Sequence, residues 1–263
     1  MDEELNNHGK ITGKLWDGIH GGYFSNKDAA APLVLTVLSR VNPLSPPGAI
    51  ADLGGGTGFI LKEIAQRLNN PSIRLINIDM SGSQLSESCT GQICTIHCPI
   101  EAVKRETLLP QSGQNGPLLF IMRSVLHYFG IGGIGDALSH IRRQMRHGEC
   151  FIHQTACFET DAHAALLSEL FRIPGLNKWF PSVNELYNIL SANGFIQTLD
   201  KEVAALPVTS RDFAKRYDID DKVLMEIGQK IKTVYGEIPG VFETRGSEFT
   251  FYLHCRIFIS EAV

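Results

Sequence analysis

AIADLGGGTGFI, residues 49–60, is the stretch of this chain that decides its fold. An apolar run that ends in an acid predicts a short strand, and a glycine-rich loop then leads into a helical pattern. The glycines at positions 54, 56 and 58 let the backbone turn sharply and approach a ligand closely, because they carry no Cβ. The helix that follows offers free N–H groups and its positive dipole end at the same place. The stretch therefore predicts a strand–loop–helix unit of the kind found at nucleotide sites.

The spacing of these glycines separates two families of nucleotide site. A dinucleotide fingerprint, G-x-G-x-x-G, requires its third glycine at position 59, where this chain has Phe59. The observed pattern is D-x-G-x-G-x-G, which resembles the first motif of class I S-adenosylmethionine-dependent methyltransferases. The resemblance implies that the amino acid part of the cofactor contacts this loop. The alternative is a tight strand-to-helix turn without a ligand. The implied contacts are Asp52, Gly54, Gly56 and Gly58.

An acid at the end of the next expected strand supports the cofactor interpretation. Asp79 follows the strand 73–78, about twenty residues after the last glycine, where a nucleoside-binding fold places an acid on the ribose hydroxyls. On its own, Asp79 is also a candidate for a helix N-cap. The resemblance implies that Met80, the next residue, lies against the adenine face.

The end of the third expected strand departs from the family that the chain resembles. That family usually has Asp or Asn there, whose side chain meets the adenine amino group, whereas this chain has Pro99. We therefore expect adenine to be held by backbone groups near Ile100 or by Glu101. Glu101 is equally suited to the first turn of a helix, where an acid is favourable.

Strands and helices alternate along the middle of the chain, which predicts a mainly parallel sheet covered on both faces. The resemblance adds a last strand, Glu248–Ile259, inserted antiparallel beside the fifth. The expected fold is α/β and Rossmann-like, with seven strands, helices on both faces and helical lid segments. The other expected strands are 49–53, 73–78, 93–98, 118–123, 149–155 and 195–203, and the expected helices include 29–40, 57–68, 83–89, 101–107, 135–146, 161–171 and one that Ser182 and Glu185 begin as a capping box.

The chain is expected to divide into a core and segments that cover it. Two amphipathic helix candidates, 210–217 and 221–235, lie in a segment that interrupts the alternating pattern. Together with the N-terminal segment they are expected to roof the substrate cavity, which favours an enclosed small molecule and excludes water. The expected units are an N-terminal helical cap 1–47, a cofactor-binding core 48–203, a helical insertion 204–246 and the final antiparallel strand 247–263.

The segment that follows the fourth expected strand carries the candidates for chemistry. Ligands bind beyond the carboxyl ends of the strands in such a sheet, which places residues 123–128 beside the cofactor loop. His127 is a candidate general base, because imidazole titrates near neutral pH, and packing against a helix is the alternative. Arg123 is expected to contact the cofactor, or a carboxylate or phosphate of the substrate, and a surface position at the end of the strand is the alternative. Tyr128 is expected to contact the substrate.

Residues elsewhere are expected to complete the substrate site. Trp16, Tyr23 and Phe24 suit a lid over a cationic cofactor, through cation–π contact, or plain packing of the N-terminal segment. Glu159 follows the fifth expected strand and is a further candidate for substrate binding. His153, inside that strand, is expected to be a hydrogen-bonded interior residue.

Composition limits the partners and the compartment. The chain of 263 residues has a net charge of −4 and no long run of Lys and Arg, which disfavours nucleic acid. No continuous apolar segment is long enough to span a membrane and the N-terminus is acidic, so we expect a cytoplasmic protein. The six cysteines form no CxxC pair. At Cys94 and Cys98 we expect buried free thiols, not a disulfide or a metal site.

The sequence as a whole favours an S-adenosylmethionine-dependent methyltransferase that modifies O, N or C of a small-molecule acceptor and releases S-adenosylhomocysteine. Transfer from an activated sulfonium depends mainly on orientation. Two alternatives from other classes stay open at this point, an NAD(P)-dependent oxidoreductase and a non-catalytic cofactor-binding module. The residues leave the acceptor and the oligomeric state open.

Overall fold

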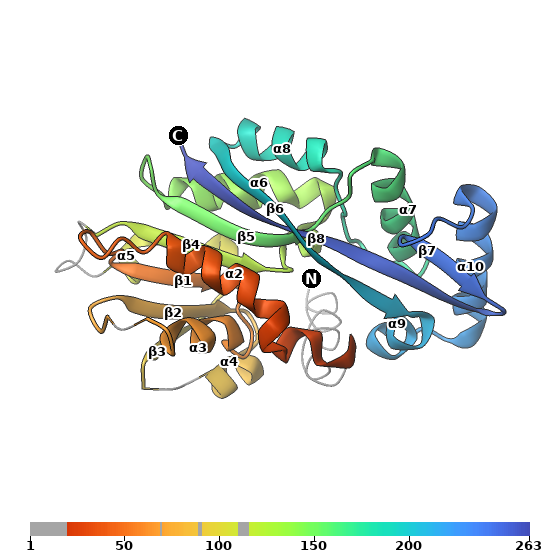
Figure 1. Cartoon of the computed structure of the whole chain (residues 1–263), viewed down its shortest axis with the longest axis horizontal. Helices are drawn as coiled ribbons and strands as arrows, with labels where there is room; N and C mark the ends of the chain where they lie inside the picture. The colour runs from red at the N-terminus through yellow and green to blue at the C-terminus, as the bar shows by residue number, and fades with distance from the viewer. Residues whose placement is uncertain (1–19, 69, 89–90, 110–115) are drawn as a thin grey trace.

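A single continuous sheet runs through the molecule (Figure 1). The computed structural model describes residues 20–68, 70–88, 91–109 and 116–263. Within these ranges, eight strands are joined in the order β3-β2-β1-β4-β5-β8-β6, and β7 pairs with β8 off this path. The strands are β1 (Ala49–Leu53), β2 (Arg74–Asp79), β3 (Ile93–His97), β4 (Leu118–Arg123), β5 (Cys150–Ala156), β6 (Phe195–Thr209), β7 (Phe242–Arg245) and β8 (Glu248–Ala262).

Helices connect most of the strands, and α2, α7, α8, α9 and α10 begin at a side-chain cap. At the start of α8 the expected capping box is confirmed, since Ser182 Oγ accepts from Glu185 N at 3.2 Å and Glu185 Oε2 accepts from Ser182 N at 2.8 Å. The described helices are η1 (His20–Ser25), α2 (Lys27–Ser39), α3 (Phe59–Ala65), α4 (Gly82–Ser88), η2 (Ile100–Ala102), α5 (Arg105–Leu108), η4 (Leu126–Phe129), α6 (Gly130–Arg143), α7 (Asp161–Arg172), α8 (Val183–Ala192), α9 (Ser210–Tyr217) and α10 (Asp221–Tyr235).

The strands β1 to β5 are parallel, and the last strand is antiparallel, as predicted. β1 lies between β2 and β4, β3 pairs with β2, and β5 pairs with β4. β8 is antiparallel to both β5 and β6 and lies between them. The predicted Rossmann-like sheet is therefore confirmed. Because the chain goes from β1 to β2 and β3 on one side and then returns to β4 on the other, a ligand crevice is expected at the carboxyl ends of β1 and β4.

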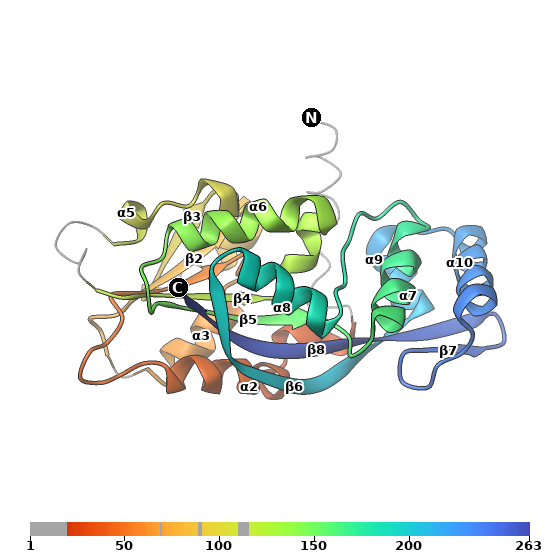
Figure 2. The ribbon, with the colours of Figure 1, turned by 90° about the horizontal axis from the view of Figure 1, so that it is seen from above.

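Helices cover both faces of the sheet (Figure 2), and alternate side chains of the buried strands belong to two different cores. In β1, Ala49, Ala51 and Leu53 belong to the core that α6 and α8 cover, whereas Ile50 belongs to the core under α2 and α3. A strand covered on both faces must be apolar at nearly every position, which explains the unbroken apolar runs in the sequence. Helices on both faces of the sheet are confirmed.

The two longest strands carry a second hydrophobic core beyond the first. β6 and β8 span 15 residues each, and their far halves pack with α7, α9, α10 and β7. Phe213 and Phe251 meet Phe171 edge-on at the centre of this core. The helices predicted at the positions of α9 and α10 are confirmed. Because β6 continues through position 204, the segment expected as a separate insertion extends the same sheet (Figure 1).

The segment 204–246, expected to be a helical insertion, also contains the strand β7. Gly246 and Ser247 connect β7 to β8 as a two-residue hairpin, with Gly246 at φ +65°. A glycine in the left-handed region at this place matches the twist of the flanking strands. The Gly-Ser pair between two runs of alternating polar and apolar residues therefore indicates a β-hairpin in the sequence.

Two predicted helices differ from the observed ones. The helix predicted over 57–68 is the shorter α3, which begins only after Gly58 because that residue is left-handed, at φ +71°. The helix predicted over 101–107 is instead the short η2 followed by the single turn α5. α6 begins at Gly130, earlier than expected, because its glycines are weak helix formers and conceal the first turns.

The expectation of a buried Cys94 is wrong. β3 is an edge strand, and Cys94 on it is exposed, while Cys98 after it is half-buried. The buried free thiols among the described residues belong to Cys157 and Cys255. Among all the residues that the structure describes, no group of three or more His, Cys, Asp or Glu side chains is arranged to hold a metal ion. None of the described helices combines the length and apolarity needed to cross a bilayer.

Candidate functional site

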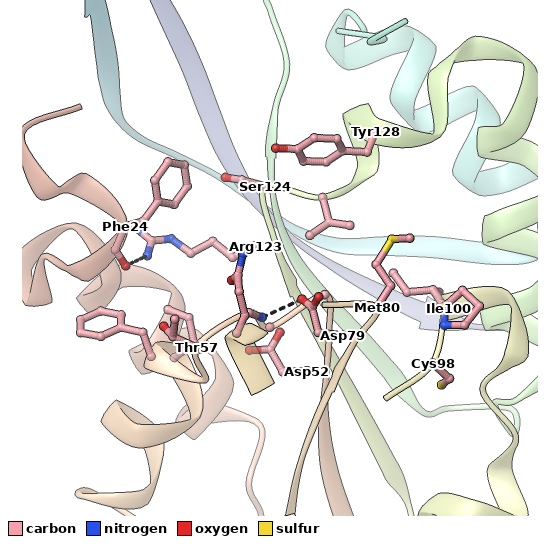
Figure 3. Close-up of a pocket in the computed structure, with 18 of the residues that line it drawn as sticks. Phe24, Asp52, Thr57, Asp79, Met80, Cys98, Ile100, Arg123, Ser124 and Tyr128 are labelled. Carbon is pink, nitrogen blue, oxygen red and sulfur yellow. Dashed lines mark hydrogen bonds between the residues drawn. The ribbon is translucent and has the colours of Figure 1, made fainter. Parts of the chain in front are cut away.

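A cavity of about 410 Å³ opens where β1, β2 and β4 end (Figure 3). This is the carboxyl edge at which the strand order predicts a crevice, and the volume suits a small-molecule site. Most of the candidates named from the sequence meet here. Those that line the cavity are Phe24, Asp52, Gly54, Gly56, Asp79, Met80, Ile100, Glu101, Arg123 and Tyr128.

The glycine-rich loop adopts a backbone conformation and a packing that exclude side chains. Gly56 lies at φ +54°, and a Cβ there would come within 2.5 Å of Gln84 Oε1. Gly58 lies at φ +71° beside Ser88, and it does not reach the cavity. The N–H of Gly54 donates to a carbonyl oxygen of β2 at 2.8 Å, which ties the loop to the sheet. Gly54 and Gly56 therefore face the ligand space, and Gly58 serves the packing behind it.

The structure requires glycine at position 55, which the sequence motif does not identify because it allows any residue there. A Cβ on Gly55 would lie 2.2 Å from Asn77 Oδ1 and 2.6 Å from Asp52 Cγ. Asn77 in turn donates from Nδ2 to Gly56 O at 2.8 Å and to Ser88 Oγ at 2.9 Å. Gly55 therefore lies against buried polar side chains that support the loop, and no side chain fits there.

Asp79 joins the loop to the start of α4. One of its carboxylate oxygens accepts from Gly56 N at 2.9 Å and the other from Ser81 N at 2.8 Å (Figure 3). The two interpretations from the sequence, a cofactor-facing acid and a helix-start residue, thus apply to one side chain that also borders the cavity. Met80, 46% exposed, and Ile100 line the cavity nearby and give it an apolar wall suited to a flat heterocycle (Figure 3).

Asp52 lies beneath the loop and is only 2% exposed. Within the described residues, its Oδ2 has no hydrogen-bond partner. Burial, followed by the charge of Asp79, raises the pKa of Asp52 to about 7, and the charge of Arg123 opposes this shift. The carboxyl group therefore offers an unused acceptor beside the cavity, and a cationic group of a ligand would stabilise its ionised form.

Arg123 fastens the N-terminal segment η1 over the cavity. Its guanidinium donates to the backbone oxygens of Phe24, at 3.1 Å, and Tyr23, at 3.3 Å (Figure 3). It also lies 5.0 Å from the ring centroid of Tyr23 and 5.5 Å from that of Phe24, which adds cation–π attraction. The Tyr23 hydroxyl accepts from Gln154 Nε2 at 2.9 Å. Arg123 and Tyr23 thus hold the roof of the cavity, and Phe24 lines it.

A smaller cavity of about 40 Å³ adjoins the first and shares Phe24 and Ser124 with it. Ser124 lies at φ +57°, a conformation that residues with side chains seldom adopt and that recurs at functional sites. His127 lines the smaller cavity and not the larger. Burial, followed by the charges of Lys178 and Arg216, lowers the pKa of His127 well below 6.5. His127 is therefore neutral at physiological pH.

Three residues that the sequence prediction misses line the smaller cavity: Lys178, Arg216 and Tyr217. Lys178 lies between α7 and α8, whereas the other two end α9, so no local motif connects them. Arg216 donates to the Tyr217 hydroxyl at 3.0 Å and to the Tyr128 hydroxyl at 2.9 Å. Because Tyr128 also lines the larger cavity, this hydrogen bond links the two spaces.

The remaining candidates do not line either cavity in the part of the chain that the structure describes. Glu159 lines neither cavity, and its exposed carboxylate pairs with Arg256. Trp16 lies outside the residues that the structure describes. His153 is buried and its Nδ1 lies 2.7 Å from Thr155 Oγ1, which confirms the interior role predicted for it.

Comparison with known proteins finds similarity in structure and none in sequence. The sequence matches no protein-family profile, and no curated protein resembles it closely enough to be identified as a relative. In structure, the YcgJ protein of Bacillus subtilis aligns with a TM-score of 0.64 at 12% identity, over 88% of this chain and 98% of that one.

Two further solved structures are methyltransferases of small molecules. Magnesium protoporphyrin IX methyltransferase from Synechocystis, with bound S-adenosylhomocysteine, aligns with a TM-score of 0.54 at 13% identity, over 99% of this chain and 94% of its own. The 1,6-didemethyltoxoflavin-N1-methyltransferase of Burkholderia thailandensis, with bound 1,6-didemethyltoxoflavin and S-adenosylhomocysteine, aligns with a TM-score of 0.51 at 14% identity, over 100% and 86% of the two chains. The chain therefore has the fold of the S-adenosylmethionine-dependent methyltransferases.

Proposed function

We propose that the chain is an S-adenosylmethionine-dependent methyltransferase that acts on O, N or C of a small-molecule acceptor. The observation that carries this proposal is one cavity that joins the glycine-rich loop, the strand-end acid Asp79 and the apolar pair Met80 and Ile100. Two methyltransferases that share its fold have S-adenosylhomocysteine bound, which supports the same cofactor here. The adjoining smaller cavity provides the side from which an acceptor would approach.

The residues of the cavity fit this cofactor part by part. The loop leaves its backbone accessible to the amino acid part, and the unpaired oxygen of Asp52 is suited to an ammonium group. Each oxygen of Asp79 already accepts one backbone N–H and keeps a lone pair for a ribose hydroxyl. Met80 and Ile100 would supply the apolar surface for adenine.

The chain's own residues have little covalent chemistry to perform. When bound, S-adenosylmethionine supplies a methyl group on a sulfonium that is already activated for displacement. The protein then has to orient the acceptor in line with that methyl group and to exclude water. The roof that Arg123 fastens, together with Phe24 and Tyr128, is placed to do both. Aromatic faces also attract a cation.

We retain His127 as the proposed base for an acceptor that must lose a proton. It is neutral, and its Nδ1 has no partner among the described residues, so it is able to accept one. Its lowered pKa makes it a weak base, and an acceptor atom that is already nucleophilic would need none. Tyr128 lines the larger cavity and Tyr23 lines the smaller one, and both remain our proposed substrate contacts.

Two other functions compete for the same cavity. An NAD(P)-dependent oxidoreductase is disfavoured because the position of the third glycine is taken by Phe59, the first residue of α3. A non-catalytic module would hold the cofactor without turnover. Thermal-shift measurements with S-adenosylhomocysteine and with NAD distinguish the first alternative, and transfer of labelled methyl groups to a metabolite extract distinguishes the second.

Replacing Asp79 with alanine is expected to weaken the binding of S-adenosylhomocysteine by about 1–3 kcal/mol, the usual loss for hydrogen bonds to a charged group. The substitution also removes the acceptor for Gly56 N, so the loop loses an anchor. Calorimetric titration of the folded variant measures the change. Asp136→Ala, at an exposed position of α6, is the matched control and is expected to bind like the wild type. Equal affinities of the Asp79 variant and the wild type would contradict the assignment.

The roof is expected to become better protected when S-adenosylhomocysteine binds. Because η1 is attached through Arg123 and borders the cavity, contact with a ligand should slow its local opening. Hydrogen exchange with and without the ligand measures this for residues 20–25 and 204–246, with the first half of β6 as the internal reference. Unchanged protection of both segments would argue against closure over the site.

The surroundings of the protein remain part of the proposal. We propose a cytoplasmic protein with small-molecule partners. The net charge of −4 and the absence of a long run of Lys and Arg disfavour nucleic acid as a partner. Neither nucleic acid nor a membrane is needed for the reaction proposed here.

A further inference from the structure

Cationic and aromatic side chains meet at the smaller cavity, which Lys178, Arg216 and Tyr217 line and beside which Tyr128 bonds to Arg216. We define the cationic cluster as Lys178, Arg216, Tyr128 and Tyr217. The Nζ of Lys178 lies 2.5 Å from the Tyr217 oxygen, and the Nε of Arg216 lies 3.0 Å from the same oxygen. Arg216 also donates to the Tyr128 hydroxyl at 2.9 Å. Two positive groups from separate elements of the chain thus converge on one phenol.

The cationic cluster brings two like charges together in the interior. Within the described residues, no carboxylate pairs with the ammonium of Lys178, whose neighbours are the rings of Tyr128 at 4.0 Å and Tyr217 at 4.6 Å. Burial, followed by the charge of Arg216, lowers the pKa of Lys178 well below 10.5. Cation–π contact offsets part of the cost of burying such a group, and an anion beside it would offset more.

The cationic cluster lies where an acceptor molecule would extend. The smaller cavity shares Phe24 and Ser124 with the cofactor cavity. Tyr128, whose ring contacts Lys178, also lines the larger cavity. Figure 3 shows the Tyr128 hydroxyl directed toward the side of the cavity where Ser124 lies. A molecule that presents a reactive atom near Ser124 therefore reaches toward Lys178 and Arg216 with its other end.

A second observation points independently to a ligand in the smaller cavity. His127 lines it and is buried, and its Nδ1 has no partner among the described residues. Leaving a buried polar group without a hydrogen bond is costly, so such a group usually has a partner. The volume of about 40 Å³ gives room for about three water-sized groups. That number matches the heavy atoms of a carboxylate.

We propose, on the basis of the methyl transfer proposed above, that the acceptor is an organic acid whose carboxylate is held by Lys178 and Arg216. A planar guanidinium and a compact ammonium are the two cations suited to this recognition. A carboxylate beside Lys178 pairs with its charge and favours the ammonium form. The transfer forms the bond between acceptor atom and methyl carbon and breaks the methyl–sulfur bond, whose electron pair stays on the neutral thioether. The proton of the acceptor leaves to His127 or to water.

The test uses the full chain, radiolabelled S-adenosylmethionine and a metabolite extract that is first separated into acidic, neutral and basic fractions. We expect the enzyme to transfer label to a compound of the acidic fraction. We expect the same result when the acidic fraction is treated with phosphatase before the reaction. Label confined to the neutral or basic fraction, or lost from the acidic one after phosphatase, overturns the organic-acid proposal and leaves the proposed methyltransferase intact. The absence of label from every fraction overturns both.

The labelled acid and its methyl ester then serve as matched probes of Lys178. Lys178→Met, which keeps the apolar stem, is expected to lose about 10–100-fold in kcat/KM for the acid, mainly through KM, and to treat the ester like the wild type. Lys222→Met, at an exposed position of α10, is the control. Arg216→Lys, which keeps the charge and loses the planar fork, provides the second test if the first variant does not fold. Equal losses for acid and ester would mean that Lys178 only fastens its loop to α9, which overturns the proposal.

Discussion

Replacing Gly55 with alanine is expected to lower the free energy of unfolding by about 3 kcal/mol or more. The added Cβ would lie 2.2 Å from Asn77 Oδ1 and 2.6 Å from Asp52 Cγ, so these groups must move. Overpacking of this kind costs about 1–3 kcal/mol. Moving Asn77 also breaks its hydrogen bonds to Gly56 and Ser88, at about 1 kcal/mol each. Because the loop has to shift, binding of S-adenosylhomocysteine should be lost as well.

Chemical denaturation of the variant and the wild type measures this effect. Gly132→Ala is the matched control, since Gly132 is exposed in α6 and a Cβ there would meet nothing within 4 Å. That variant is expected to gain about 0.5–1 kcal/mol, because alanine favours the helix. If Gly55→Ala were as stable as the wild type, the loop would be able to move away from Asn77 and Asp52 without cost, which would contradict the packing argument.

The cofactor half of the site could be predicted because its signals are local. The glycine-rich loop and Asp79 lie within one strand–helix–strand unit, and each reflects a rule of backbone geometry or of sheet topology. The capping box at Ser182 is local in the same sense. Gly55 escaped prediction because a motif records which positions carry glycine in a pattern, whereas the need for glycine here comes from Asn77 on the neighbouring strand.

The acceptor half could not be predicted, because its residues meet only in the folded chain. Tyr128 follows β4, Lys178 lies between α7 and α8, and Arg216 ends α9. In the sequence, a lysine or arginine in a polar segment ordinarily indicates a solvated surface. Only the extension of β6 and β8, which brings α9 back over the sheet, reverses that meaning, because it buries Arg216 and half-buries Lys178. Glu159 shows the opposite case, since its place after β5 suggested the site and its side chain lies at the surface.

Asp52→Asn is expected to raise the free energy of unfolding at pH 8. Burial, followed by the charge of Asp79, raises the pKa of Asp52 from 3.8 to about 7 in the folded protein. Between these values the folded protein keeps a proton that the unfolded chain has released. The free energy of unfolding therefore falls as the pH rises from about 4 to about 7 and is level above that. At about 1.36 kcal/mol per pKa unit, the loss is on the order of 4 kcal/mol.

Denaturation at a series of pH values between 4 and 8 measures this difference. The variant lacks the titration, so its advantage over the wild type should be absent near pH 4 and reach roughly a few kcal/mol at pH 8. Asp136→Asn, at an exposed position, is the control and should follow the wild type at every pH. A variant less stable than the wild type at pH 8 would show that the Asp52 carboxylate is paired in the folded protein.

Binding explains why a group that destabilises the fold would stand beside the cavity. An ammonium group near Oδ2 favours the ionised form of Asp52. The affinity of the wild type for S-adenosylhomocysteine should therefore increase as the pH rises through about 7. Below pH 7, binding should release the proton that Asp52 carries in the free protein. The affinity of the Asp52→Asn variant should be weaker and independent of pH over this range. Calorimetry in buffers of different ionisation enthalpy measures both. If the variant bound as tightly as the wild type at pH 8, Asp52 would lower stability without a benefit to binding. Weaker binding by the variant would show that Asp52 lowers the stability of the fold because it recognises the cofactor.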